Sequence, residues 1–506
     1  MFRAYEQDQE FLLPPSLHDF IGESHPAHLV NDIVERLDLN ALTERYGSMG
    51  QPAYPPRLML KVILYGFSVG IFSSRKLQRA CEENLAFKFL AGMETPAFKT
   101  FIEFRQRHRE DMKAVFVETV KLARELGLAK LGAVALDGTK MEANTSKGKA
   151  MTYGRMLEEE KRLKAEITAM LDAAEATDAK EDEEVGPGSD GYNLSEELAL
   201  KEKRLAKIEA AKRALEEREH RTHAGKPIEA NKSISFADKD ARCFRKKSEG
   251  TEYVYNSQAA VDMESQVIVG NHIEDAVVDE KAAELALEGI KEDLGTCPEK
   301  LVMDAGYGNQ HTLESCEKRG VVPVCAISRE GKAPAPMPLD DWAYERERDR
   351  FICRHGGIFE FDRFHENTGK RIYRSVEKIS CGCSQWQGKD GRRFLALKQW
   401  FWSRRELRRI MEEHDHQALY RRRKCTVEPV FGQIREAMGF GRYYYRGKEK
   451  VRSEWNLVCA AFNIRKIVGW MMKGVPIGGD GPADRFSGHL SFLNADNNRA
   501  LPFAFA

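Results

Sequence analysis

The 506-residue chain lacks an apolar run long enough to cross a membrane, because its longest run, residues 62–72, falls well short of the roughly 20 residues a spanning helix needs. Its first residues show no basic segment followed by an apolar stretch, so we expect no secretory signal peptide. With ten cysteines in a chain of this length, we expect reduced thiols rather than a disulfide framework. No Gly-Lys-Ser/Thr phosphate loop is present, which gives no support for a nucleotide cofactor. A membrane protein, a secreted disulfide scaffold and a fibrous protein are thereby excluded, and a cytoplasmic protein of several domains is expected.

The chain also lacks net charge, but opposite charges are unevenly distributed. Residues 171–200 hold ten Asp and Glu against one Lys, whereas residues 391–450 hold sixteen Lys and Arg against seven Asp and Glu. A net charge of +9 over those 60 residues is typical of a surface that binds a polyanion. A solvated, arginine-rich helix is the alternative interpretation of the same pattern.

The periodicity of apolar residues divides the chain. Residues 1–26 form an N-terminal arm, and helical spacing with capping signals predicts an all-α domain over residues 27–130. From residue 132 the pattern changes to short apolar runs that suit buried strands, at 132–136, 253–261, 266–273, 300–303 and 321–327. Helices are expected at 279–294 and 310–319. The order of these elements predicts an α/β catalytic domain with a mixed sheet over residues 131–470.

Three segments interrupt or follow this domain. Residues 155–171 and 195–221 are rich in Glu, Lys, Ala and Leu and predict a helical hairpin, inserted over 150–225 with a Gly- and acid-rich linker at 181–193. Residues 330–395 are turn-rich and contain three cysteines. Residues 471–506 are rich in Gly, Asp, Asn and Phe, and we expect this C-terminal tail to be poorly ordered.

Acidic residues follow two of the predicted strands. Asp137 in ALDGT and Asp304 in VMDAGYG each come at the end of an apolar run, and Glu428 lies within the basic segment RRRKCTVEPVFGQIR. Carboxylates at strand ends suit a hard metal ion, although Asp-Gly after a strand is more often a turn and acids beside arginines are often structural ion pairs. If the three acids share two divalent ions, Mg²⁺ with Mn²⁺ as a substitute, they could activate an oxygen nucleophile and stabilise the leaving oxygen of a phosphodiester.

Basic residues near Glu428 are candidates for holding DNA phosphates. Arg421, Lys424 and Arg435 have helical spacing with Glu428 and predict a shared face, although Pro429 disfavours a helical Glu428 unless the helix begins there.

Several long motifs, in order along nearly the whole chain, resemble one family. YPPRLMLKVILYGFSVGIFSSRKLQRACEENLAFKFLAG, VALDGTKMEANTSK, YNSQAAVD, MDAGYGN and VEPVFGQIREAMGFGRYYYRG followed by NLVCAAFNIRKI are similar to the DDE transposases of bacterial insertion sequences, nearest to the branch called insertion-sequence family eleven-eighty-two. The resemblance implies an RNase H-like fold in which Asp137, Asp304 and Glu428 match the acidic triad. It also implies Mg²⁺-dependent cleavage at element ends and transfer of the 3′-OH into target DNA.

The resemblance extends to DNA-contacting residues and partners. Arg435, seven residues after Glu428, matches a basic position that grips DNA in related transposases, and Lys140 matches the family's DGTK, where it contacts phosphate or pairs with a carboxylate. Arg442 and Arg446 flank three tyrosines that either stack on bases or pack in the protein. The implied partners are double-stranded DNA, both terminal repeats and target, bound by a homo-oligomer at the bacterial nucleoid.

A possible zinc site is separate from the triad. Cys353, His355, Cys381 and Cys383 offer a Cys₃His ligand set, and the family often has a cysteine cluster here, but this chain has CxC in place of CxxC. Reduced thiols without metal are the alternative. A cut-and-paste transposase is the expected function, with a catalytically silent, transposase-derived DNA-binding protein and a nuclease without strand transfer as the rivals.

Overall fold

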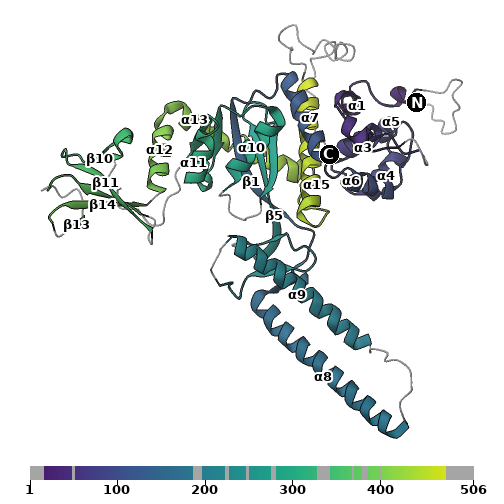
Figure 1. The fold of residues 1–506 in the computed structure, drawn as a ribbon. Coiled ribbons are helices and arrows are strands. Elements are labelled where there is room, and N and C mark those ends of the chain that lie inside the picture. Colours follow the sequence, from purple (N-terminus) through teal and green to yellow (C-terminus); the bar gives the residue numbers. More distant parts are fainter. Residues whose placement is uncertain are drawn as a thin grey trace, which may run out of the picture.

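The computed structural model describes residues 16–47, 52–185, 196–222, 227–246, 250–274, 281–326, 342–366, 370–378, 386–388, 390–398 and 400–473. It is a mixed α/β structure with a helical N-terminal region. A central sheet lies beside these helices, two long helices project from it, and a second sheet lies at the opposite side of the molecule (Figure 1). In the described part of the chain, no helix is both long and apolar enough to span a bilayer.

The N-terminal region is helical, as expected. After a short 3₁₀ turn at Leu17–Phe20 it contains α1 (Pro26–Arg36), α2 (Asn40–Thr43), α3 (Pro56–Ser68), α4 (Ser74–Glu83), α5 (Leu85–Leu90), α6 (Phe98–Arg107) and α7 (Met112–Glu125). Apolar side chains such as Leu60, Ile63 and Phe101 are fully buried between these helices. Burying this shared stripe stabilises short helices that would be marginal alone.

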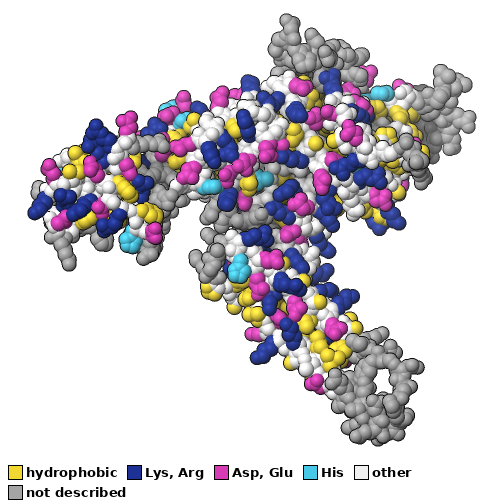
Figure 2. Space-filling model, viewed as in Figure 1, with side chains coloured by type: hydrophobic (Ala, Val, Ile, Leu, Met, Phe, Trp, Pro, Cys, Tyr) yellow, Lys and Arg dark blue, Asp and Glu magenta, His cyan; other side chains and the backbone are white. Residues whose placement is uncertain are grey.

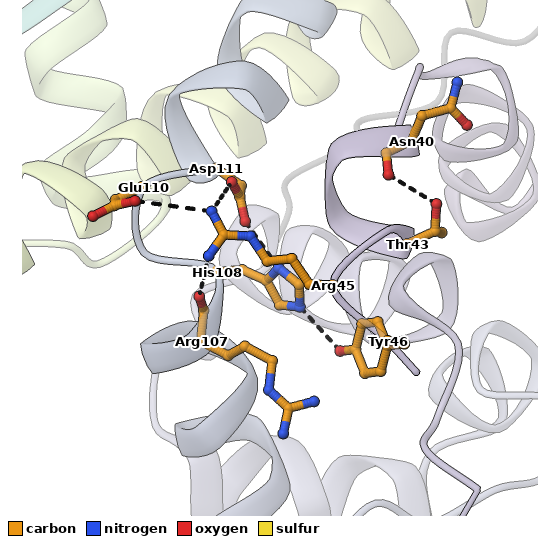
Figure 3. Close-up of polar contacts among 8 residues, drawn as sticks. All are labelled: Asn40, Thr43, Arg45, Tyr46, Arg107, His108, Glu110 and Asp111. Atoms are coloured by element: carbon orange, nitrogen blue, oxygen red, sulfur yellow. Dashed lines mark hydrogen bonds and ion pairs between the residues drawn. The ribbon is translucent and has the colours of Figure 1, made fainter. Parts of the chain in front are cut away.

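A buried polar chain fastens α2 to the turn between α6 and α7 (Figure 3). The Tyr46 hydroxyl lies 3.0 Å from Nε2 of the fully buried His108, whose Nδ1 lies 3.0 Å from Asp111 Oδ2. Arg45 donates to Asp111 Oδ1 at 2.8 Å and to the Arg107 carbonyl at 3.3 Å. These hydrogen bonds link the residues that follow α2 to the turn between α6 and α7. The polar groups at the centre of the network have partners, which avoids the cost of burying them unpaired.

The central sheet has the order β4-β5-β1-β7-β8, with β6 pairing a further part of β5. β5 pairs antiparallel with β1, β4 and β6, and β7 and β8 run parallel to β1. The strands are β1 (Ala133–Glu142), β4 (Arg242–Lys246), β5 (Gly250–Asp262), β6 (Ile268–Glu274), β7 (Lys300–Met303) and β8 (Val322–Cys325).

Helices cover this sheet and connect it to the N-terminal region. They are α10 (Ala282–Leu294), α11 (Gln310–Glu317), α12 (Trp400–Glu412), α13 (His414–Arg423), α14 (Val427–Gly432), a π-helical turn at Gln433–Ala437, and α15 (Lys448–Met471). α15 packs against α7, α3 and β6, and the side chain of its buried Asn463 bonds both backbone groups of Ile268 at 2.9 Å. One hydrophobic core therefore runs from α1 to α15.

The two long helices, α8 (Tyr153–Val185) and α9 (Glu196–Thr222), lie side by side and extend away from the sheet (Figure 1). α8 continues into the region where a linker was expected. Ion pairs join the helices, including Lys212 to Glu160 and Arg204 to Glu159, each at 2.6 Å. Near the sheet, a short β2–β3 ladder (Ala150–Thr152, Ser233–Ser235) and a small core close the base; the core contains Met156, Leu163, Ile208, Ala211, Leu215 and Ile234.

The turn-rich region contains an antiparallel sheet that the sequence did not predict. Its order is β13-β14-β12-β11-β10-β9, formed by Trp386–Gln387, Arg393–Lys398, Lys370–Ser375, Ile358–His365, Arg350–Ile352 and Ala343–Glu345. A small core of its own, including Trp342, Phe351 and Tyr373, holds it together. Figure 2 shows Lys and Arg side chains over its visible face, mixed with Asp and Glu.

Candidate active site

Asp137 and Asp304 lie on neighbouring parallel strands. Leu136 of β1 pairs with Met303 of β7, so the two aspartates are the next residues beyond the last paired position. Both side chains are partly buried. Burial raises the pKa of the Asp137 carboxyl and the charge of Asp304 raises it further, while the Gly138 amide and Arg423 oppose the shift. Two carboxylates are thus held close together at the end of the parallel pairing.

The strand that carries Asp137 does not end there, contrary to the sequence-based expectation. β1 continues to Glu142 because its other edge pairs with the long antiparallel strand β5, with Asp137 opposite Ala259. Only the parallel neighbour β7 stops. Asp137 therefore projects from a continuous strand at the point where the sheet opens on one side, which is a more rigid support than a turn.

Backbone and side-chain bonds orient the two carboxylates. Asp137 Oδ1 accepts the Gly138 amide at 2.8 Å, and Asp304 Oδ1 accepts the Gly306 amide at 2.7 Å. Burial raises the pKa of the Cys325 thiol to about 12, so the thiol is protonated and donates to the Asp304 carbonyl at 2.8 Å. One oxygen of each aspartate is thereby fixed by a backbone amide.

Arg423 is a residue at this site that the sequence did not single out. Its Nη1 donates to Asp137 Oδ2 at 2.9 Å, and its side chain is only 7% exposed. It is the last residue of α13 and the third arginine of the run RRR, which predicted positive charge but not which arginine turns inward. The ion pair links α13 directly to β1.

A buried glutamine braces the loop that carries Asp304. Gln258 on β5 accepts the Tyr307 hydroxyl at 2.7 Å. It also fills the space beside Gly138, where a Cβ would lie 2.8 Å from the Gln258 Cδ and 2.9 Å from the Asn256 Oδ1. Glycine at 138 lets this polar layer of β5 pack against β1 next to Asp137.

Glu428 is apart from the two aspartates. α14 begins at Val427, so Glu428 lies in its first turn, and Pro429 is tolerated there because that turn needs no amide donor. α14 packs on β1, but the Glu428 side chain is exposed. Among the described residues, no three His, Cys, Asp or Glu side chains are close enough to share a metal ion. The structure therefore brings together Asp137 and Asp304 but not Glu428.

The paired aspartates fit a divalent cation. Mg²⁺ is typically bound by one or two carboxylates, with waters and substrate phosphates completing its shell. Here two carboxylates lie near each other, and burial, with a smaller effect from the charge of Asp304, raises the pKa of Asp137; a bound cation would favour the ionised form again.

Two of the three basic residues predicted to share a face with Glu428 lie on other elements. Arg421 and Lys424 are exposed at the end of α13 and in the turn after it, on a different helix from Glu428. Arg435 lies in the π-helical turn, where it donates to Thr139 Oγ1 and, at 2.9 Å, to the Lys140 carbonyl. The break in the helix at residues 424–426 separates Arg421 and Lys424 from the helix that carries Glu428.

Two other residues that were predicted to contact DNA line a separate cavity. Arg442 donates to the Asn144 side chain at 3.3 Å and Arg446 to the Asn144 carbonyl at 2.7 Å, and both line a cavity of about 390 Å³. Of the adjacent tyrosines, Tyr443 is fully buried and bonded to the Ser257 hydroxyl at 2.6 Å, whereas Tyr444 is exposed. Tyr443 therefore belongs to the protein core, and Tyr444 remains accessible.

The possible zinc ligands are only partly described. Cys353 is buried in the core of the β9–β14 sheet, where its sulfur accepts the Gly357 amide at 3.2 Å, and His355 is exposed. Cys381 and Cys383 lie outside the described residues. The zinc site stays a prediction.

Two family models match the chain. One, described as a transposase domain (DUF772), matches residues 15–107, which hold the helices from α1 to α6. The other, described as a transposase DDE domain, matches residues 378–468, which include Arg423, Glu428 and most of α15. No curated protein and no solved structure matched the chain.

Proposed function

We propose that the chain, which matches a transposase domain and a transposase DDE domain, is a DDE transposase of an insertion sequence that cleaves DNA at the ends of its element and joins them to target DNA by a metal-dependent mechanism. The observation that carries the proposal is the adjacency of Asp137 and Asp304 beyond the parallel pairing of β1 and β7. The sheet supports an RNase H-like fold, because β5 pairs antiparallel with β1, β4 and β6 while β7 and β8 continue the sheet parallel to β1. The branch, family eleven-eighty-two, rests on the sequence motifs.

Asp137 and Asp304 would hold Mg²⁺, and we propose that Glu428 joins them when DNA is bound. α14 packs on β1, so the acid lies on an element that already contacts the strand of Asp137. A pair of such ions, for which Mn²⁺ can substitute, supplies an activated oxygen nucleophile and stabilises the leaving oxygen of a phosphodiester.

The chain's own residues orient this site. Arg423 holds Asp137 Oδ2, the Gly138 and Gly306 amides hold one oxygen of each aspartate, and Arg423 is placed to hold a phosphate if the ion pair opens. Exposed Arg421 and Lys424 would bind DNA backbone beside it.

We propose that the helical region over residues 27–130 binds the terminal repeats, and that the α8–α9 pair supports dimerisation or braces DNA across two element ends. The proposal for α8 and α9 is supported by their projection from the sheet and by the mixed charges on their exposed surfaces (Figure 2). Deleting residues 155–221 should abolish end pairing without abolishing the binding of a single end; retained pairing would remove this role.

The test is cleavage of labelled DNA carrying the element's ends in Mg²⁺. We compare wild type with Asp304→Ala, with Glu428→Gln and with Asp415→Ala, a control whose carboxylate is about 90% exposed on α13. Wild type and the control should cut, while the two site variants should bind ends but not cut.

Other outcomes favour the rival functions. End binding without cleavage by wild type would indicate a silent DNA-binding protein derived from a transposase. Cleavage without joining to a target plasmid would indicate a nuclease. If Glu428→Gln alone retained full cleavage, the third acid would be a different residue.

A further inference from the structure

A second cavity lies at the N-terminal end of β1, whereas Asp137 lies in the middle of that strand. The turn between β5 and β6, the ends of α13 and α15, and the residues after α7 enclose about 650 Å³. Met263 in that turn donates its amide to the carbonyl of Ala133, the first residue of β1. Asp137 is four residues farther along the strand, or roughly 13 Å at 3.3 Å per residue.

The lining of this cavity is strongly cationic. Five basic side chains line it against one carboxylate, that of Glu264, which Lys130 pairs at 3.1 Å. The basic residues are Lys130, Arg422, Arg465, Lys466 and Lys473, and Trp470 supplies an aromatic wall. A cavity with this balance of charge suits an anion better than a neutral or cationic ligand.

Backbone strain holds one wall in place. Gln266 has a φ of +61°, a left-handed conformation that a residue with a side chain seldom adopts. Its amide spans the cavity, donating to the Cys425 carbonyl at 3.2 Å and accepting from Lys466 Nζ at 2.8 Å. Such strain persists where the surroundings demand it, and it is concentrated at binding sites.

The Lys466 ammonium is poorly compensated. Its hydrogen-bond partner Gln266 is neutral, and its other near contact is the face of Phe462 at 5.3 Å. Burial, together with the charges of Arg465 and Lys473, lowers the pKa of Lys466 to about 8. An anion in the cavity would relieve both effects.

We infer that this cavity, which we call the cationic pocket, binds a backbone phosphate of the DNA whose scissile phosphate occupies the active site. The link is the end of α13, where Arg422 donates to the Met263 carbonyl at 2.9 Å and the next residue, Arg423, holds Asp137. The pocket and the active site thus adjoin successive residues of α13, so one DNA strand can contact both. This inference rests on the proposed function.

The experiment measures binding and cleavage of element-end DNA by Lys466→Gln and Arg422→Gln. Arg452→Gln is the matched control, because it removes one charge from an exposed position of α15 outside the pocket. Each pocket variant should weaken end binding several-fold and lower the slope of log Kd against log salt by about one, with unchanged melting temperature. The control should leave both quantities unchanged.

A second arm locates the phosphate. Single neutral methylphosphonates are moved along the strand, and one position away from the cleavage site should weaken wild-type binding but not weaken Lys466→Gln further. Equal additional losses in wild type and variant would refute the inference, as would a wild-type salt slope in both pocket variants. Loss of binding to inorganic phosphate alone, with DNA affinity unchanged, would assign the pocket to a free anion instead. Failure of wild type to cut at all would count against the proposed function, not against the pocket, because the binding measurements stand without cleavage.

Discussion

Replacing Arg423 by alanine tests whether the ion pair with Asp137 holds the active site together. The two charges are joined at 2.9 Å, with the arginine side chain 7% exposed and the aspartate 20% exposed. At an effective dielectric constant of about 20, unit charges about 4 Å apart attract by roughly 4 kcal/mol, and desolvation offsets much of this. Removing one partner of a fully buried pair costs about 3–5 kcal/mol. Because Asp137 keeps some contact with water, we expect Arg423→Ala to lower the free energy of unfolding by about 2–3 kcal/mol.

The matched variant is Asp137→Asn, which keeps an oxygen to accept from Arg423. Burial raises the pKa of Asp137 above its usual value, so the folded protein holds that proton more tightly than the unfolded chain. The ionised carboxylate therefore lowers stability as pH rises through the window from 3.8 up to the raised pKa, and asparagine removes this penalty at neutral pH. We expect Asp137→Asn to change stability by less than about 1 kcal/mol while abolishing cleavage.

The assay is urea denaturation at pH 7, followed by far-ultraviolet circular dichroism, for wild type, both single variants and the double variant. Arg423→Ala should be less damaging in the Asp137→Asn background, giving a coupling of about 1–2 kcal/mol. An Arg423→Ala variant as stable as wild type, or a loss of equal size in both backgrounds, would refute the argument that this pair stabilises the site.

Three further predictions concern buried groups. Burial raises the pKa of Glu454 to about 7, so the free energy of unfolding should fall by on the order of 3 kcal/mol as pH rises from 4.5 through 7. In urea titrations at several pH values, Glu454→Gln should depend less on pH than wild type. The same pH dependence in both proteins would contradict this prediction. Burial lowers the pKa of His108, so the stability that the neutral imidazole contributes should be lost as pH falls below 6.5. At neutral pH, His108→Ala should lower the free energy of unfolding by about 1–3 kcal/mol and Tyr46→Phe by about 1 kcal/mol. Equal losses of the two variants in thermal melts would argue against the hydrogen-bonded network around His108. Gly138→Ala should displace Gln258 and lower the free energy of unfolding by about 1–3 kcal/mol. It should also reduce cleavage while the binding of element ends persists. Full cleavage would show that the layer beside Asp137 tolerates a methyl group.

Local pattern predicted the regular elements well where burial was uniform. β7 spans Lys300–Met303, as its apolar run indicated, because a short parallel strand buried on both faces reads as a continuous hydrophobic segment. The antiparallel sheet from β9 to β14 was missed, because strands such as Ile358–His365 mix charged and aromatic residues and bury only a small core.

The sequence by itself determined which acids are candidates, since motif and strand pattern selected Asp137, Asp304 and Glu428. It also determined the helical N-terminal region and the alternation of strands and helices that the structure contains. These features depend on local periodicity and on residues close together in the chain.

Tertiary structure alone decided which of these residues meet. The pairing of β1 with β7 sets Asp137 beside Asp304 across 167 positions of sequence, and the inward turn of Arg423 joins residues 286 apart. The helix break after α13 separates Arg421 from Glu428, and the π turn directs Arg435 to β1. Contacts of this kind depend on how whole elements pack, and no local spacing specifies them.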